Sequence, residues 1–88
     1  MKPRICLIED DPIMGEALSE RLDMEGFDCD WFQRGREALS GLLHKGYRLV
    51  ISDIRLPDIS GEDLFAELLR SGQPLPLSGW VDTQPREQ

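Results

Sequence analysis

Hydrophobic residues occur along the chain in two patterns, short runs and longer periodic stretches. The runs at residues 4–8 and 49–52 are mostly apolar and stop at carboxylates, which predicts strands of a parallel sheet buried on both faces. Residues 27–32 instead alternate large apolar side chains with Asp28 and Asp30. That period of two predicts a half-exposed strand towards an edge of the sheet.

Apolar residues recur at helical spacing in three longer stretches, which predicts amphipathic helices over 13–25, 35–46 and 61–70. Each helix would bury one stripe of side chains against the sheet. We expect these stripes to consist of Met14, Ala17, Leu18 and Leu22 in the first helix, Ala38, Leu39, Leu42 and Leu43 in the second, and Leu64, Phe65, Leu68 and Leu69 in the third.

Small and polar residues mark the predicted helix ends. Asp10 or Asp11 can cap the first helix, because Pro12 suits its first turn. Ser60 can cap the third helix, with Asp63 three residues further on. Glycines are expected to close the first two helices; these are Gly26 and Gly46.

The alternation of strands and helices over residues 1–72 predicts an α/β domain. Its parallel sheet would have helices on both faces and right-handed crossovers. Residues 73–88 begin rich in Pro and Gly and end polar, without any period, so we predict an irregular tail. Within this tail, Leu75–Leu77 could form no more than a stub of strand, because Pro76 lacks an amide hydrogen.

Composition excludes several functional classes. The 88 residues form one domain at most, and the net charge of −7 with scattered Lys and Arg argues against binding to nucleic acid or anionic membranes. No apolar run is long enough for a transmembrane helix, and the start of the chain lacks a signal-peptide pattern, so we expect a cytoplasmic protein. We interpret Cys6 and Cys29 as small buried hydrophobic residues, and His44 as a favourable charge at a helix end.

Carboxylates follow two of the predicted strands. Glu9, Asp10 and Asp11 come after the first strand and Asp53 after the third, at the strand ends where α/β sheets bind ligands. Asp53 alone could equally close a turn. A shared acidic pocket needs a cation, and oxygen ligands without His or thiolate suit Mg²⁺ or Mn²⁺. A carboxylate beside such an ion can attack phosphorus, so Asp53 is the candidate nucleophile.

The residues Ile-Glu-Asp-Asp-Pro at 8–12, taken with Asp53, Pro57 and Gly61, resemble the receiver domain of bacterial two-component response regulators. The resemblance covers Arg4 to about Gly72. It implies a flavodoxin-like (CheY-like) fold and a role in phosphorelay signal transduction. It also implies that the chain is a switch that is phosphorylated, and not an enzyme in the ordinary sense.

The resemblance implies a role for each acidic residue. Asp53 would be the phospho-acceptor, Asp10 a direct ligand of Mg²⁺ or Mn²⁺, Glu9 a ligand through water, and the backbone carbonyl of Arg55 a further ligand. Asp11 would be a helix cap. The phosphoryl donor would be a phosphohistidine on a sensor histidine kinase or on a phosphotransfer protein.

This chain also departs from the family pattern. Receivers have five βα units, with Ser or Thr ending the fourth strand and a catalytic Lys ending the fifth, whereas only three units are predicted here. Neither Lys2 nor Lys45 could supply that Lys, so no catalytic lysine is expected, and Ser78 is the candidate for the hydroxyl. We therefore expect a receiver truncated after its third unit. Its third strand would form an exposed apolar edge, open to a second copy or to another receiver.

Three functions remain open on the sequence. The first is a shortened phosphorelay receiver. The second is a remnant or interaction module that pairs with kinases or receivers without being phosphorylated. The third is a metal-dependent phosphohydrolase, which is disfavoured because such enzymes carry Asp-x-Asp and Arg55 occupies the second position here.

Overall fold

A computed structural model describes residues 2–44, 46–52, 58–72 and 80–82 of the chain. Strands and helices alternate along it as predicted. In chain order the elements are β1 (Arg4–Ile8), α1 (Pro12–Met24), β2 (Asp28–Phe32), α2 (Gly35–His44), β3 (Leu49–Ser52), α3 (Gly61–Ser71) and β4 (Trp80–Asp82).

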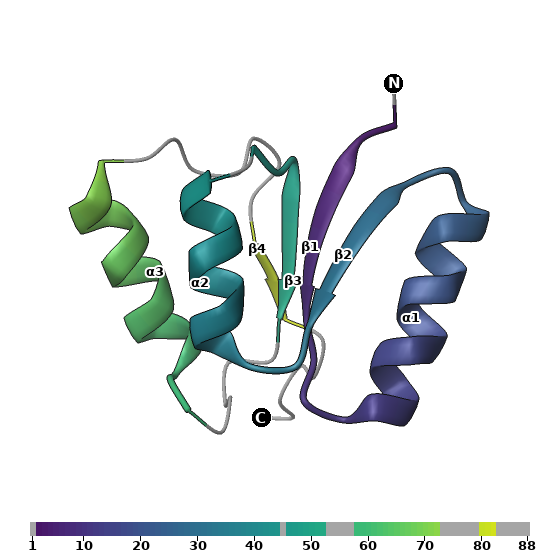
Figure 1. Cartoon of the computed structure of the whole chain (residues 1–88), viewed down its shortest axis with the longest axis horizontal. Helices are drawn as coiled ribbons and strands as arrows, with labels where there is room; N and C mark the ends of the chain where they lie inside the picture. Colours follow the sequence, from purple (N-terminus) through teal and green to yellow (C-terminus); the bar gives the residue numbers. More distant parts are fainter. Residues whose placement is uncertain (1, 45, 53–57, 73–79, 83–88) are drawn as a thin grey trace.

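The strands form one parallel sheet in the order β2-β1-β3-β4. Helix α1 lies on one face of this sheet, while α2 and α3 lie together on the other (Figure 1). The α/β fold with helices on both faces is thus confirmed. The described residues contain three βα units followed by a fourth strand.

Strand β4 corrects one prediction about the sheet. Its residues pair in parallel with β3, with Val50 opposite Trp80 and Ser52 opposite Asp82, so β3 is not the exposed edge that the sequence suggested. The strand lies beyond Leu75–Leu77, inside the segment for which we predicted irregular structure. The strand was not predicted because its three residues are too few to show an alternating pattern. Its backbone can still pair with β3, because that pairing does not depend on such a pattern.

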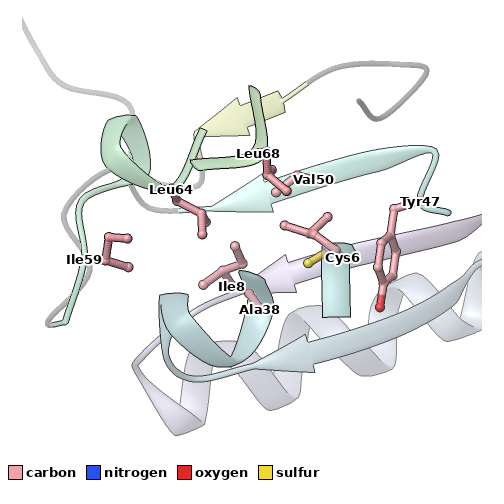
Figure 2. Close-up of a cluster of buried hydrophobic side chains, with 9 residues drawn as sticks. Cys6, Ile8, Ala38, Tyr47, Val50, Ile59, Leu64 and Leu68 are labelled. Carbon is pink, nitrogen blue, oxygen red and sulfur yellow. The ribbon is translucent and has the colours of Figure 1, made fainter. Parts of the chain in front are cut away.

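The main hydrophobic core lies between the sheet and the helices α2 and α3 (Figure 2). Leu64 and Leu68 of α3 and Ala38 of α2 pack there with the inward side chains of β1 and β3. The buried residues of this core are Cys6, Ile8, Ala38, Leu42, Tyr47, Val50, Ile59, Leu64 and Leu68.

Helix α1 packs differently from its predicted stripe. Its one buried residue is Gly15, where an added Cβ would lie 2.2 Å from the indole of Trp31 on β2. The close approach of helix backbone and indole turns the helix so that Met14 is 40% exposed and Ala17 is exposed too. The prediction of Met14 and Ala17 as buried was therefore wrong, whereas Leu18 and Leu22 are partly buried.

The predicted stripe of α2 is confirmed, and that of α3 is half right. In α2, Ala38 and Leu42 are buried and the neighbouring leucines pack against the same core. In α3, Phe65 and Leu69 are 38% and 55% exposed. A single row of side chains suffices for α3 because it touches the core along one narrow face.

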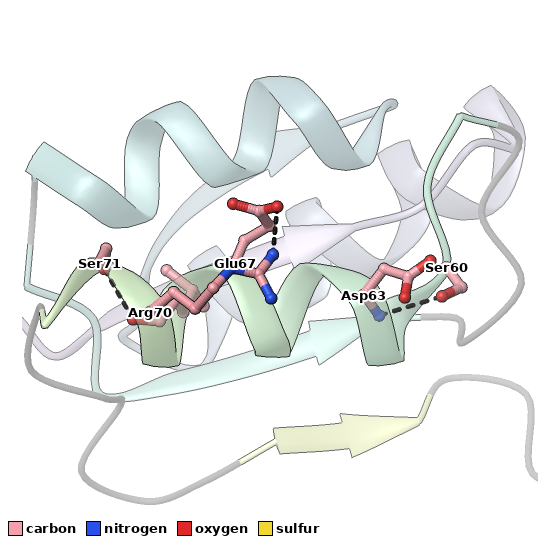
Figure 3. A network of polar contacts seen from close by, with 6 residues as sticks. Ser60, Asp63, Glu67, Arg70 and Ser71 are labelled. Atoms are coloured by element: carbon pink, nitrogen blue, oxygen red, sulfur yellow. Dashed lines mark hydrogen bonds and ion pairs between the residues drawn. The ribbon is translucent and has the colours of Figure 1, made fainter.

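The helix ends follow the predicted chemistry with one exception. Asp11 caps α1, since its Oδ1 accepts hydrogen bonds from the amides of Ile13 and Met14 at 2.9 and 3.5 Å. Ser60 caps α3 by accepting from the amide of Asp63 at 3.0 Å (Figure 3). Gly26 adopts a positive φ of 93° after α1. Gly46 does not, because α2 already ends at His44.

One apolar hollow remains beside α1. Its volume is about 190 Å³, and residues of β1, α1 and β3 contribute to its walls. The hollow is lined by Pro3, Ile5, Leu22, Phe27, Arg48, Leu49 and Ile51.

Candidate functional site

The carboxyl ends of β1 and β3 lie side by side. The two strands are in parallel register with Ile8 opposite Ser52, and these residues directly precede Glu9 and Asp53 in the sequence. The sheet thus brings together the two strand ends that carry the predicted acidic residues. Asp53 itself lies outside the described residues, as do Arg55, Pro57, Ser78 and Lys45.

Glu9 is fixed at its strand end by three hydrogen bonds. Its amide donates to the carbonyl of Phe32 at 2.9 Å, and its own carbonyl accepts from the Trp31 indole Nε1 at 3.0 Å. Its carboxylate Oε2 accepts from the amide of Asp11 at 3.2 Å, and the residue is fully buried. Burying a carboxyl group costs free energy unless hydrogen bonds compensate for the lost contact with water. The hydrogen bonds of Glu9 therefore both offset this cost and hold the residue in place at the end of β1.

The next two carboxylates have different environments. Asp10, two residues beyond the end of β1, is exposed to solvent. Asp11 is exposed too but is engaged as the cap of α1. The structure therefore agrees with the expectation that Asp11 is a cap.

The described donors suit a hard cation. Glu9 and Asp10 offer carboxylate oxygens, the ligands that Mg²⁺ and Mn²⁺ prefer. Within the described residues, no three His, Cys, Asp or Glu side chains are grouped so that they could hold a metal ion. Two of the four predicted ligands, Asp53 and Arg55, lie outside the described residues, so the complete ligand set remains a prediction.

Asp58 is a residue that the sequence analysis did not single out. Its Oδ1 accepts a hydrogen bond from the amide of Gly35 at 2.9 Å, and its Oδ2 accepts from the amide of Arg36 at 3.0 Å. Burial works against ionisation of the carboxyl, but the hydrogen bonds from Arg36 and Gly35 and the charge of Arg34 outweigh it, so the pKa of Asp58 is lowered. No local pattern could reveal this contact, because its partners are more than twenty residues apart.

The hydrogen bond between Tyr47 and Asp30 was likewise not predicted from the sequence. The Tyr47 hydroxyl donates to Oδ2 of Asp30 at 2.6 Å. Burial and this negatively charged acceptor both raise the pKa of Tyr47. The alternating pattern had assigned Asp30 to a solvent-exposed face, but both faces of β2 are partly covered.

The prediction of two buried cysteines is right for Cys6 and only partly right for Cys29. Cys6 is buried, and burial raises the pKa of its thiol. Cys29 is only partly buried, although burial raises its pKa as well. His44 lies at the end of α2, where its Nδ1 is 2.7 Å from the carbonyl of Ser40. Across the part of the chain that the structure describes, no helix has the length and apolarity needed to cross a membrane.

Comparison with known proteins finds relatives over most of the chain. The family model of the response regulator receiver domain matches residues 5–79. The chain is 39% identical over 74 residues to the transcriptional regulatory protein QseB of Escherichia coli O157:H7. This match covers 84% of the chain but only 34% of that regulator, so the chain spans about a third of its length.

Solved structures show the same fold. The non-phosphorylated HemR receiver domain of Leptospira biflexa superposes with a TM-score of 0.75 and 28% identity, over 97% of this chain and 85% of that one. The response regulator TrrA of Thermotoga maritima, solved in complex with Mg²⁺ and BeF, gives a TM-score of 0.72 and 39% identity. That match covers 82% of this chain and 62% of TrrA. With a receiver model matched over most of its length and the receiver fold in its sheet and helices, the chain belongs to the response regulator receiver domain family.

Proposed function

We propose that this receiver domain accepts a phosphoryl group on Asp53 in a Mg²⁺-dependent reaction. The observation that carries the proposal is the register of β1 and β3, in which Ile8 lies opposite Ser52. This register brings the residue before Asp53 next to the strand end that holds the buried Glu9. Membership of the receiver family supports a partner histidine kinase.

The proposed reaction transfers phosphorus from nitrogen to oxygen. A carboxylate oxygen of Asp53 attacks the phosphorus of a phosphohistidine on a sensor histidine kinase or a phosphotransfer protein. The new P–O bond forms as the P–N bond breaks, and the donor imidazole leaves with the electron pair and takes up a proton. The receiver is thus changed by the reaction instead of turning over as an ordinary enzyme. Because the kinase phosphohistidine derives from ATP, we place the phosphoryl transfer in the cytoplasm.

The residues proposed to hold the cation are Asp10 directly, Glu9 through water, Asp53, and the carbonyl of Arg55. When bound, Mg²⁺ or Mn²⁺ would neutralise these oxygens and the phosphoryl group, which reduces the repulsion between two anions. The Mg²⁺–BeF complex of TrrA supports this choice of cation by family relationship. Glu9 offers a carboxyl group that is held in place at the strand end, because its backbone amide and carbonyl are both hydrogen-bonded to β2.

Labelling with a small phosphodonor tests the proposal. We expect the purified chain, incubated with acetyl phosphate and Mg²⁺, to gain a phosphoryl group in intact-protein mass spectrometry. Asp53→Asn should abolish the adduct, because an amide is a poor nucleophile. Asp11→Asn is the matched control and should label like the wild type, since asparagine is an equally good helix cap.

The controls separate the alternatives. Circular dichroism of the same samples shows that each variant is folded, and EDTA should suppress labelling of the wild type. Equal labelling of wild type and Asp53→Asn would exclude Asp53 as acceptor. A folded wild type without any adduct would instead favour the interaction module, whose binding to kinases or receivers does not need phosphorylation.

A further inference from the structure

Trp31 contacts the chain on both sides of the connection between β1 and α1. Its indole Nε1 donates to the carbonyl of Glu9, which directly follows β1, at 3.0 Å. Beyond the connection, the same indole lies against Gly15 of α1, where an added Cβ would be 2.2 Å from the ring. The amide of Gly15 donates in turn to the carbonyl of Asp11 at 2.8 Å. One side chain of β2 therefore restrains segment 9–11 from both sides.

The bond to the indole fixes the peptide plane that leads into Asp10. The carbonyl of Glu9 and the amide of Asp10 belong to one planar peptide unit, so a donor bound to the carbonyl restrains the whole unit. The pairing of β1 with β2 ends with Ile8 opposite Phe32, and beyond this pair the carbonyl of Glu9 is bonded to a side chain. The backbone on the N-terminal side of Asp10 is therefore held by Trp31.

The peptide unit that follows Asp10 is restrained as well. The amide of Asp11 donates at 3.2 Å to Oε2 of Glu9, which is fully buried. Asp10 consequently lies between two hydrogen-bonded peptide planes, while the residue itself is exposed. A carboxylate on a backbone that is already ordered loses less conformational freedom when it binds a cation.

We propose that Trp31 is a positioning residue for the divalent cation: its indole N–H fixes the backbone from which the Asp10 carboxylate reaches the ion. This inference rests on the proposed function, because Asp10 and Glu9 are the ligands concerned, and both belong to the described part of the chain. Without the indole donor, the peptide unit between Glu9 and Asp10 can turn. Part of the binding free energy is then needed to order it.

Two substitutions disturb this contact in different ways. Trp31→Phe keeps an aromatic ring on β2 but removes the N–H donor. Gly15→Ala keeps Trp31, but the new methyl group would lie 2.2 Å from the ring, so the indole or α1 must move. Because alanine favours helical structure more than glycine does, Gly15→Ala disturbs the contact without weakening the helix itself.

Gly41→Ala is the matched control for Gly15→Ala. Gly41 also lies inside a helix, α2, and an added Cβ there would be 2.8 Å from the ring of Phe32. Both substitutions thus crowd an aromatic side chain of β2, but Gly41→Ala leaves the indole of Trp31 in place. Asp10→Asn is the positive control, because loss of the carboxylate should weaken any cation bound at this strand end.

The test is a Mg²⁺ titration of the full chain and of each variant, followed by NMR at a temperature where circular dichroism shows all of them folded. We expect Trp31→Phe and Gly15→Ala each to weaken Mg²⁺ binding by about tenfold, as loss of a partner that orients a metal ligand does. Gly41→Ala should stay within about twofold of the parent, because independent sites couple little. Asp10→Asn should also bind the ion more weakly than the parent.

The indole N–H signal of Trp31 tests the same coupling in reverse. If the indole bond favours the Mg²⁺-bound state, Mg²⁺ must stabilise that bond by the same factor. The chain has two tryptophans, and the indole signal that disappears in Trp31→Phe belongs to Trp31. Its hydrogen exchange should slow when Mg²⁺ is added to the parent and should not respond in Asp10→Asn. A purely structural role of the indole would leave the exchange unchanged by Mg²⁺.

The outcomes separate this inference from the proposed function. If the parent binds Mg²⁺ and is labelled on Asp53, but Trp31→Phe and Gly15→Ala bind the ion as the parent does, the positioning role is refuted and the proposed function stands. If the parent neither binds Mg²⁺ nor is labelled, both are refuted. Equal losses in Gly15→Ala and Gly41→Ala would also refute the positioning role, because crowding of β2 would explain both. Losses in Trp31→Phe and Gly15→Ala, with binding retained in Gly41→Ala, confirm the inference.

Discussion

At the scale of single residues, Tyr47 shows how one hydroxyl links the connection between α2 and β3 to the strand β2. The residue lies between α2 and β3, and its ring is packed in the core (Figure 2). Its hydroxyl donates to Asp30 on the edge strand β2. A neutral phenol can donate this bond, whereas a phenolate would place a second negative charge beside the carboxylate. Ionisation of Tyr47 is therefore opposed in the folded state.

This arrangement predicts a shifted titration of Tyr47. It is the single tyrosine of the chain, so phenolate absorbance near 295 nm reports it directly. In the folded protein the pKa should lie above the usual value of about 10, because burial and Asp30 both oppose ionisation. In concentrated urea the titration should return to about 10.

The shift fixes the sign of the pH dependence. A group whose folded-state pKa is raised stabilises the fold fully below its unfolded value, and this stability is lost as the pH rises towards the folded value. Stability should thus decline above about pH 10, and Tyr47→Phe should remove that part of the decline. Identical titrations in buffer and in urea would contradict the hydrogen bond to Asp30.

At the scale of whole elements, α3 shows that apolar residues at helical spacing predict a helix but do not decide which of these residues are buried. Four apolar residues follow helical spacing, but two adjacent leucines end in opposite environments. Leu68 is 2% exposed and Leu69 is 55% exposed. The direction of the helix relative to the sheet decides between them, and that direction depends on contacts made by other segments.

The two leucines form a matched pair for a stability measurement. Leu68→Ala should lower the free energy of unfolding by about 2–4 kcal/mol, because it removes buried contacts and leaves a cavity. Leu69→Ala should cost less than about 1 kcal/mol, because its side chain is already largely in water. Urea denaturation followed by circular dichroism measures both; equal losses would show that α3 is rotated from its described position.

The elements predicted from the sequence were those with a strong local signal. All three predicted strands and all three helices are present. The strands were marked by apolar runs or by alternation, and the helices by their period and by capping residues such as Asp11 and Ser60. Strand β4 was missed because its three residues are too few to show a period and directly follow a segment rich in Pro and Gly. The inward side of α1 was misjudged because Gly15, which has no side chain to count as apolar, makes the closest approach to Trp31.

The candidate site was predictable to a similar degree. Glu9 and Asp10 could be identified because carboxylates directly after an apolar strand are conspicuous, and Asp11 because it precedes Pro12. Asp58 could not, because its partners in α2 are distant in sequence and any polar residue would fit the loop pattern. Asp53, Arg55 and Ser78 lie outside the described residues and remain predictions.

At the scale of the whole molecule, charge opposes compactness. The chain has 17 acidic and 10 basic residues, a net charge of −7. Packing this charge into one small domain creates self-repulsion that the unfolded chain largely avoids. Salt should therefore stabilise the domain by screening.

Thermal melts at two salt concentrations test this expectation. Raising NaCl from about 0.05 M to about 0.5 M shortens the screening length severalfold. We expect the melting temperature to rise by about 4–8 °C for each 1 kcal/mol of repulsion removed. EDTA in both buffers keeps divalent ions from contributing. At a pH near the pI of about 4.5 the same salt change should have much less effect; an equal rise there would indicate a general salt effect on apolar burial.

The strand order has a consequence for the synthesis of the protein. Strand β1 is made before β2 and β3, yet it lies between these two strands in the sheet. During synthesis, one edge of β1 can pair only after residues 28–32 have been made. The other edge can pair only after residues 49–52 have been made. Unpaired apolar strands are where nascent chains aggregate. Until β3 has been made, one edge of β1 therefore stays unpaired and open to such contacts.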